Sequence, residues 1–160
     1  MAVYEKIFAA ISAAVLVLLL IAVGYAAIGL GINLPSHREV IPVKPGQNLA
    51  SAVLETPPFN TPGLRQIAKN KYEAVVIASA WSFLPSEFDL PAGAEVTFRV
   101  TSADVTHGFF IPGTRVNTMV IPGQISVITY RFDKPGTYLL ICHEYCGLLH
   151  HTMAGKVVVK

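Results

Sequence analysis

Four residues near the C-terminal end of the chain carry side chains that bind soft metal ions, and they lie at short intervals. Cys142, Cys146, His150 and Met153 follow the spacing C-x3-C-x3-H-x2-M. The twelve residues that they delimit contain both cysteines of the chain, three of its five histidines and one of its three methionines. Thiolate, imidazole and thioether groups together are ligands that copper prefers. We therefore interpret this stretch as a metal-binding loop.

Three other interpretations of the cysteines remain open at this point. Cys142 and Cys146 could form a local disulfide in an oxidising compartment, or they could be buried free thiols, because cysteine is often interior. Neither of these explains why a histidine and a methionine follow at matching intervals. The cysteines could also bind zinc with His150 and one further ligand, which would leave Met153 without a role.

A copper site that contains both cysteines needs a second imidazole from outside the loop. A mononuclear blue copper site uses one Cys, two His and a weakly bound Met, whereas two thiolates are enough to bridge two coppers. His107 is the strongest remote candidate, because it follows the alternating segment Glu95–Thr101, where a loop at one end of a sandwich would lie. His37, beside an apolar segment, and His143, between the cysteines, fit less well.

Short β-strands are expected before and after this loop. In Glu95–Thr101, the apolar residues Val96, Phe98 and Val100 alternate with polar residues, which indicates one buried face. Short strands bounded by Gly or Pro, without helices between them, predict a β-sandwich or barrel. The other expected strands are Glu73–Ala80, His107–Ile111, Thr118–Ile121, Ile125–Phe132, Thr137–Ile141 and Lys156–Lys160.

The chain begins with a long apolar segment. No charged residue occurs from Ile7 to Ser36. About twenty apolar residues span a bilayer as a helix, and this run is longer than the apolar region of a cleaved signal peptide, which is the alternative. We expect residues 1–36 to be a transmembrane anchor helix. Residues 37–71 are expected to be a linker with irregular structure, in which 47–55 could form a short helix, and residues 72–160 one β-domain.

Charge and motif content exclude other classes of function. The net charge is only +2, and the sequence has no basic cluster and no phosphate-binding glycine-rich loop, so we expect no nucleic-acid partner. No nucleophile–base pair or pair of carboxylates stands out. The sequence therefore offers no catalytic group of these kinds.

Three stretches of the sequence carry a resemblance to a known family. They are Thr101–His107, Pro135–Cys142 and the loop Cys142–Met153. Together they resemble subunit II of heme-copper cytochrome c oxidases, and the similarity covers the apolar N-terminal segment and nearly all of residues 72–160. A single membrane helix instead of two resembles the B-type members. The resemblance implies an all-β, cupredoxin-like Greek-key sandwich with one N-terminal transmembrane helix.

The resemblance also implies the dinuclear copper centre called CuA. Its ligands would be His107, Cys142, Glu144, Cys146, His150 and Met153. Both cysteines would bridge the two coppers. His107 and Met153 would complete one copper, and His150 with the backbone carbonyl of Glu144 would complete the other. The family spacing selects His150 and not the adjacent His151.

Two further residues receive expectations. The resemblance implies that Trp81 lies close to the copper centre and marks where electrons enter, whereas Phe83 is expected to serve in packing. Asp104 is expected to act mainly in a turn, and the alternative is a carboxylate that orients a ligand or meets the electron donor.

The implied function is electron transfer in a respiratory oxidase. The chain would accept electrons from cytochrome c or a similar one-electron donor and pass them to heme in subunit I, where oxygen reduction is coupled to proton pumping. The expected partners are subunit I, a small further subunit, the donor and the lipid bilayer. The N-terminus would face the cytoplasm, and the copper domain would lie on the outer side of the plasma membrane. The alternative is a membrane-anchored cupredoxin that carries copper.

Overall fold

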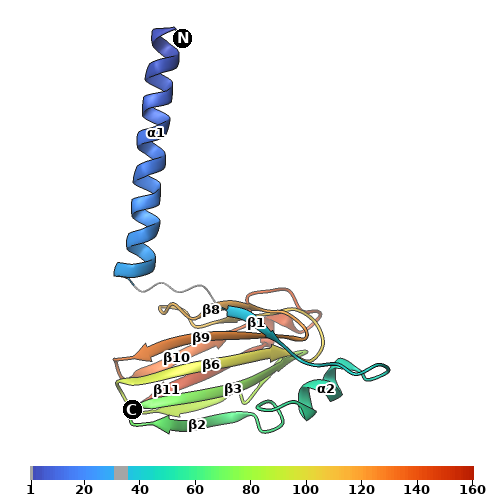
Figure 1. The fold of residues 1–160 in the computed structure, drawn as a ribbon. Coiled ribbons are helices and arrows are strands. Elements are labelled where there is room, and N and C mark those ends of the chain that lie inside the picture. The colour runs from blue at the N-terminus through green and yellow to red at the C-terminus, as the bar shows by residue number, and fades with distance from the viewer. Residues whose placement is uncertain (1, 31–35) are drawn as a thin grey trace. The chain divides into compact units, whose positions relative to one another are not determined.

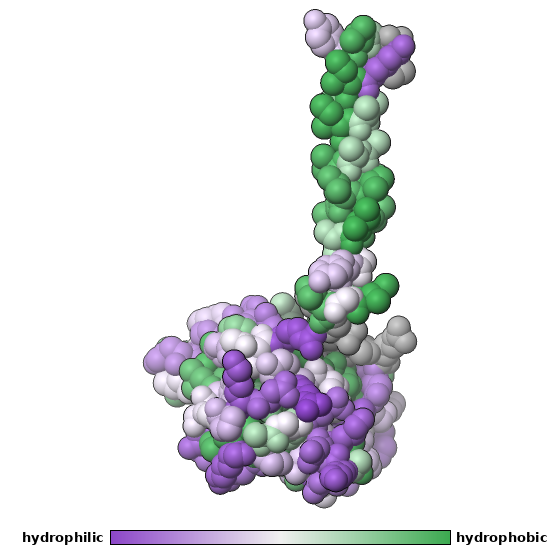
Figure 2. Space-filling view, turned by 90° about the vertical axis from the view of Figure 1, so that its left-hand side faces the viewer, coloured by the Kyte–Doolittle hydropathy of each residue, from purple (hydrophilic) through white to green (hydrophobic). Residues whose placement is uncertain are grey.

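The computed structural model describes residues 2–30 and 36–160, which form a helical N-terminal unit and a globular unit (Figure 1). The N-terminal unit is α1 (Val3–Gly24), which continues as a π-helical segment, η1 (Tyr25–Gly29). Apolar side chains cover almost the whole of this helix in the view of Figure 2, and none of them is buried within the chain. Its 27 residues are long and apolar enough to cross a membrane.

The globular unit is a sandwich of two β-sheets (Figure 1). Within residues 36–160, the six strands of the first sheet are β1 (Ser36–Val40), β9 (Gln124–Phe132), β6 (Ala94–Ser102), β3 (Lys71–Ser79) and β2 (Gly63–Ala68) in this order, with β4 (Ser82–Leu84) paired to β3. The five strands of the second sheet are, in order, β5 (Glu87–Leu90), β11 (Ala154–Val159), β10 (Gly136–Ile141), β7 (His107–Phe110) and β8 (Asn117–Val120).

Both sheets mix parallel and antiparallel pairs. β3 runs parallel to β6 in the first sheet, and β5 runs parallel to β11 in the second, whereas the other strand pairs are antiparallel. All of the strands expected from the sequence are present, with ends that differ by at most two residues. The predicted β-sandwich with one N-terminal apolar helix is therefore confirmed.

Strand β3 explains why its sequence is apolar without alternation. Its side chains at Ala74, Val76 and Ala78 belong to the core between the two sheets. Those of Val75 and Ile77 point to the opposite face and join a second buried cluster. Because successive side chains of a strand point to opposite faces, a strand that is covered on both sides is apolar throughout.

The segment 37–71, expected to be a linker, contributes three elements to the globular unit. These are β1, β2 and the helix α2 (Leu49–Glu55), whose first turn is capped by the Asn48 side chain, which accepts a hydrogen bond from the N–H of Ser51 at 2.8 Å. Ala52 and Val53 of α2 pack with Phe59 in the second buried cluster, over the outer face of β3. The expected short helix at 47–55 is thus present.

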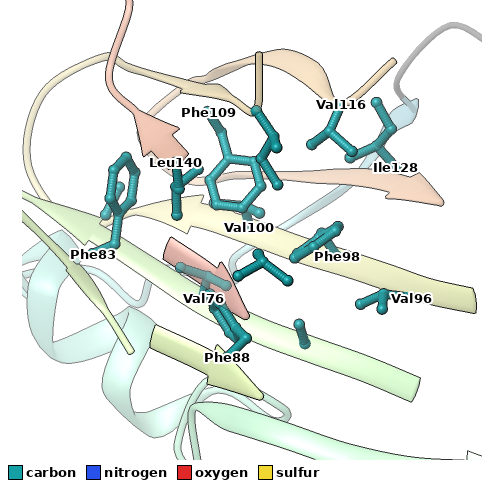
Figure 3. Close-up of a cluster of buried hydrophobic side chains, with 14 of the residues drawn as sticks. Val76, Phe83, Phe88, Val96, Phe98, Val100, Phe109, Val116, Ile128 and Leu140 are labelled. Carbon is teal, nitrogen blue, oxygen red and sulfur yellow. The ribbon is translucent and has the colours of Figure 1, made fainter. Parts of the chain in front are cut away.

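Aromatic rings form the centre of the sandwich core (Figure 3). The rings of Phe98 and Phe109 have centroids 5.3 Å apart, and those of Phe83 and Phe109 meet edge-to-face at 5.6 Å. Phe83 is thus a packing residue, as expected. The same buried cluster also contains Cys142, Cys146 and Met153, so the apolar core extends to the loop in which the sequence places the metal site.

Candidate metal centre

The loop with both cysteines connects the two strands of a β-hairpin. Strands β10 and β11 pair up to Ile141 and Ala154, and the N–H of Cys142 donates to the carbonyl oxygen of Met153 at 3.2 Å. The loop therefore begins and ends at adjacent points of one sheet. Two residues that are eleven positions apart in the sequence, Cys142 and Met153, are brought together by this closure.

His107 reaches the loop because β7 lies beside β10. Ile141 pairs with Phe110, and the N–H of Gly108 donates to the Cys142 sulfur at 3.3 Å. A Cβ at Gly108 would lie 2.5 Å from the backbone nitrogen of His143, so only glycine permits this approach of the two strands. The predicted partnership of His107 with the loop thus follows from the sheet topology.

The sulfur atoms lie at the centre of the group. Cys142 Sγ is 3.8 Å from Cys146 Sγ and 4.0 Å from His107 Nδ1. Ligand atoms of these three buried residues all lie within 4.8 Å of one another. The two cysteines are free thiols, since a disulfide would bring the sulfur atoms to about 2 Å. The disulfide interpretation is therefore not supported by the geometry.

The other side of Cys146 faces the end of the loop. His150 Nδ1 lies 3.5 Å from Cys146 Sγ, and the Met153 Sδ lies 3.7 Å from it. His150 begins a 3-10 turn, η2 (His150–Thr152), which directs its ring inward, whereas His151 is exposed. The structure thus brings His150 and not His151 to the cysteines.

The backbone of Glu144 was expected at the site, whereas His143 and His37 were judged to fit it less well. The carbonyl oxygen of Glu144 is 3.2 Å from Cys142 Sγ, so the backbone of Glu144 lies beside the sulfur atoms. His143 is exposed and its ring packs edge-to-face on Phe110, with centroids 6.1 Å apart. The side chain of His37 lies outside the residues whose side chains the structure describes.

Trp81 lies directly against the loop. Its indole N–H donates to the carbonyl oxygen of Cys146 at 3.1 Å. A Cβ at Gly147 would be 3.1 Å from the same indole nitrogen, so the ring and the loop backbone are in close contact. The structure therefore places the expected aromatic residue next to a cysteine of the site.

Two groups in this region have shifted pKa values, in opposite directions. Burial and the adjacent Cys142 raise the pKa of the Cys146 thiol to about 11. Burial alone would raise the pKa of Asp104, but hydrogen bonds with His107 and from backbone N–H groups outweigh it and hold the pKa below its usual value. Cys146 is therefore a neutral thiol at neutral pH when no metal is bound, and Asp104 is a carboxylate.

Two contacts of the site differ from the main expectations. Asp104 Oδ1 lies 2.8 Å from His107 Nε2, which matches the alternative given for this residue, a carboxylate that contacts a ligand, and not only the turn role that was favoured. The hydrogen bond from Gly108 to Cys142 had no separate signal beyond a glycine that directly follows a histidine. The contact between Gly108 and Cys142 joins segments that come together only when the sheet forms, whereas Asp104 and His107 are three positions apart in the sequence.

The donor set fits copper. Two thiols, two imidazoles and a thioether converge within the distances given above, and a thioether is a ligand for copper more often than for zinc. A zinc site could use both cysteines and both histidines, but it would leave the buried Met153 without a function. Copper is the metal that gives a role to every side chain in the group.

Comparisons with known proteins agree with this geometry. Residues 83–160 match the family model "Cytochrome C oxidase subunit II, periplasmic domain". A cytochrome c oxidase subunit 2 of Thermus thermophilus is 37% identical over 161 residues, which cover 98% of this chain and 92% of that protein.

Solved structures give the same result. A chain of a heme-copper terminal oxidase dimer, determined by cryo-EM, matches with a TM-score of 0.78 and 33% identity over 98% of this chain and 99% of that one. The periplasmic domain of subunit II of the Bradyrhizobium japonicum cytochrome oxidase matches with a TM-score of 0.51 and 22% identity, covering 55% of this chain and 83% of that one, which supports the fold alone. The fold is cupredoxin-like, and the chain belongs to the cytochrome c oxidase subunit II family.

Proposed function

We propose that this chain receives electrons from an external one-electron donor, such as cytochrome c, and passes them to heme in subunit I. Membership of the family makes it a membrane-bound subunit of a heme-copper oxidase complex, with one N-terminal apolar helix. Oxygen reduction and proton pumping would belong to subunit I. The chain would supply the site at which electrons are accepted.

One observation carries this proposal. The Cys142 and Cys146 sulfurs are 3.8 Å apart, with an imidazole nitrogen of His107 at 4.0 Å from the first sulfur and one of His150 at 3.5 Å from the second. Two thiolates and two imidazoles this close together support a dinuclear centre, in which Cys142 and Cys146 would supply a thiolate to both coppers and each histidine would complete one of them. Such a centre, when bound, would take up and give up one electron shared between two metals.

Each of the two remaining proposed ligands lies close to one of the thiolates. Met153 Sδ and the carbonyl oxygen of Glu144 are in position to act as weak ligands, at 3.7 Å from Cys146 Sγ and 3.2 Å from Cys142 Sγ. The burial of Cys142, Cys146 and Met153 in the sandwich core keeps water away from the sulfurs. A rigid, dry site suits electron transfer, because the ligands then move little when the charge changes.

Trp81 is the proposed point of electron entry into the centre. Its indole contacts a carbonyl of a proposed ligand, and the residue is half-buried, so part of the ring is open to a partner. The proposed orientation of the chain in the membrane follows from the same role in electron entry. A donor outside the cell requires the globular unit on the outer side and the N-terminus in the cytoplasm.

Electron paramagnetic resonance of the full-length chain, reconstituted with copper in detergent, tests the proposal. We expect a hyperfine pattern from one unpaired electron shared by two equivalent copper nuclei. Cys142→Ser and Cys146→Ser should each abolish this pattern, and the exposed Thr152→Ser is a matched control that should keep it. A pattern from a single copper nucleus in the wild type would contradict the dinuclear assignment.

A copper carrier is the second candidate, and it predicts different behaviour. A carrier should transfer its copper to a chelator or to another protein on reduction, whereas an electron-transfer centre should retain it. The buried sulfurs favour retention. Repeated cycles of reduction and oxidation, followed by measurement of bound copper, separate the two: loss of copper in each reduced phase would favour the carrier.

A further inference from the structure

The carboxylate of Asp104 connects two parts of the site that are far apart in the sequence. Its Oδ1 lies 2.8 Å from His107 Nε2, and its Oδ2 accepts the N–H of Ala80 at 2.7 Å. Ala80 directly precedes Trp81, whose indole is hydrogen-bonded to Cys146. One side chain therefore contacts both a proposed ligand and the turn that carries the aromatic residue beside the loop.

We propose that Asp104 is a positioning residue, which holds His107 in the orientation that binds metal and holds Trp81 against the loop. The functional meaning of this inference rests on the copper centre proposed above. Its geometric content does not, because the contacts of Asp104 belong to the chain without metal.

The effect on His107 follows from the two nitrogen atoms of its ring. In a neutral imidazole, one ring nitrogen carries a hydrogen and the other carries a free lone pair. A hydrogen bond to an acceptor at one nitrogen places the hydrogen there and leaves the lone pair on the other nitrogen. With Nε2–H donating to Asp104, the lone pair is on Nδ1, which faces Cys142 Sγ at 4.0 Å. His107 is fully buried, so water cannot replace the carboxylate as its partner. Carboxylates that bond to metal-binding histidines orient the ring in this way.

The effect on Trp81 follows from the contacts at the turn. The hydrogen bond from Ala80 to Asp104 joins positions that are 24 residues apart. A turn role for Asp104 is fulfilled by its local bonds, namely the acceptance of the Val105 N–H at 2.6 Å and the contact with the Ser102 hydroxyl at 3.3 Å. Neither local bond requires the contact with Ala80, so that contact has the separate effect of fixing the start of the turn at Trp81.

The test uses Asp104→Ala and the isosteric Asp104→Asn in the full-length chain in detergent. The matched control is Asp133→Asn, which removes an equal charge from an exposed ion pair with Arg131. Nitrogen-15 NMR of the metal-free protein reports the tautomer of His107. Trp81 is the single tryptophan of the chain, so its fluorescence reports the turn directly.

We expect the wild type to show His107 protonated at Nε2, and Asp104→Ala to lose this preference and to shift Trp81 emission to longer wavelength. Asp104→Asn should show smaller changes in the same direction, and Asp133→Asn none. Copper affinity, measured by competition with a chelator, should fall about tenfold in Asp104→Ala.

The outcomes separate this inference from the proposed function. If folded Asp104→Ala and Asp104→Asn both keep the wild-type tautomer, tryptophan emission and copper affinity, Asp104 is only a turn residue and the inference is wrong. If the wild type binds no copper pair, the proposed function fails, but the tautomer and fluorescence of the metal-free protein still decide the role of Asp104.

Discussion

The two imidazoles of the metal centre are held in different ways. His107 begins β7, is fully buried and is bonded to Asp104. His150 lies in a 3-10 turn at the end of the loop and is partly exposed, with its ring centroid 5.8 Å from that of the exposed Tyr145. The first imidazole is part of the core of the sandwich, and the second is part of its surface.

This difference separates two contributions to the site. The side of the centre with His107 is built by the fold, so its geometry exists before metal binds. The side with His150 depends on residues 147–152 of the loop, all of which are half-buried or exposed, and local stability in proteins is lower where less of the chain is buried. We therefore expect changes near His107 to affect folding and binding together, and changes near His150 to affect mainly binding.

The largest effect is expected from replacing each histidine in turn. In the metal-free chain, His107→Ala should lower the free energy of unfolding by about 2–4 kcal/mol, because it leaves a cavity in the core and Asp104 without its partner. His150→Ala should lower it by less than about 1 kcal/mol, because the ring is partly exposed. Denaturant unfolding measures both. Equal losses would show that the two sides are equally part of the core.

The next effect concerns the glycines on the two sides. Gly108→Ala should cost about 1–3 kcal/mol, because its Cβ would meet the backbone of His143, which cannot move without the loop. Gly147→Ala should cost about 1 kcal/mol: its φ of +116° is strained for alanine, but the Cβ would meet only the side chain of Trp81. Thermal unfolding of the two variants compares them, and a reversed order would contradict the close approach of the strands.

Alkaline pH should lower the free energy of unfolding of the metal-free protein through the ionisation of Cys146. Its pKa of about 11 in the folded chain lies above the ordinary value of 9.0, so the folded state holds the proton more tightly. This contribution to stability is complete below pH 9 and is lost as the pH rises to 11, by up to about 2 kcal/mol. Denaturant unfolding curves at pH 8.5 and 11 measure this loss of stability. Cys146→Ser should make the loss between the two pH values smaller. An equal loss in the variant would show that other groups cause it.

The smallest effect on stability is expected at Trp81. Trp81→Phe removes the hydrogen bond to the Cys146 carbonyl and should cost about 1 kcal/mol, but it should slow the reduction of the copper-loaded chain by its donor. Tyr138→Phe removes a comparable hydrogen bond, to the carbonyl of Lys134, at the other end of β10. Stopped-flow reduction should be slowed only by the first change. Equal rates would remove Trp81 from the electron path.

The sequence predicted the parts of the fold that have a local pattern. Val96, Phe98 and Val100 alternate, and they form the buried face of β6. Strand β2 has no such pattern, because four of its six residues are exposed at the edge of the sheet. Strand β1 also pairs with a distant partner, β9. Segments whose place in a sheet depends on remote strands carry little local signal, which is why 37–71 was expected to be a linker.

The candidate site shows the same division. The spacing from Cys142 to Met153 was informative, because one hairpin loop brings these residues together. His107 needed the assumption of a sandwich, because it reaches Cys142 through the pairing of β7 with β10. Asp104 and His107 are only three positions apart in the sequence. Aspartate is nevertheless so common in turns that its presence here did not favour a role at the metal over a turn role.

The continuity of the apolar core with the three sulfur atoms has a consequence for how long the metal stays bound. Cys142, Cys146 and Met153 are packed in the same cluster as Phe98 and the other core rings. A metal that binds only the folded state shifts the folding equilibrium towards that state. Local opening of the loop at His150 would expose only that side of the metal centre. Complete release of copper therefore requires the core around the sulfur atoms to open. The lifetime of the loaded protein should therefore follow its rate of global unfolding.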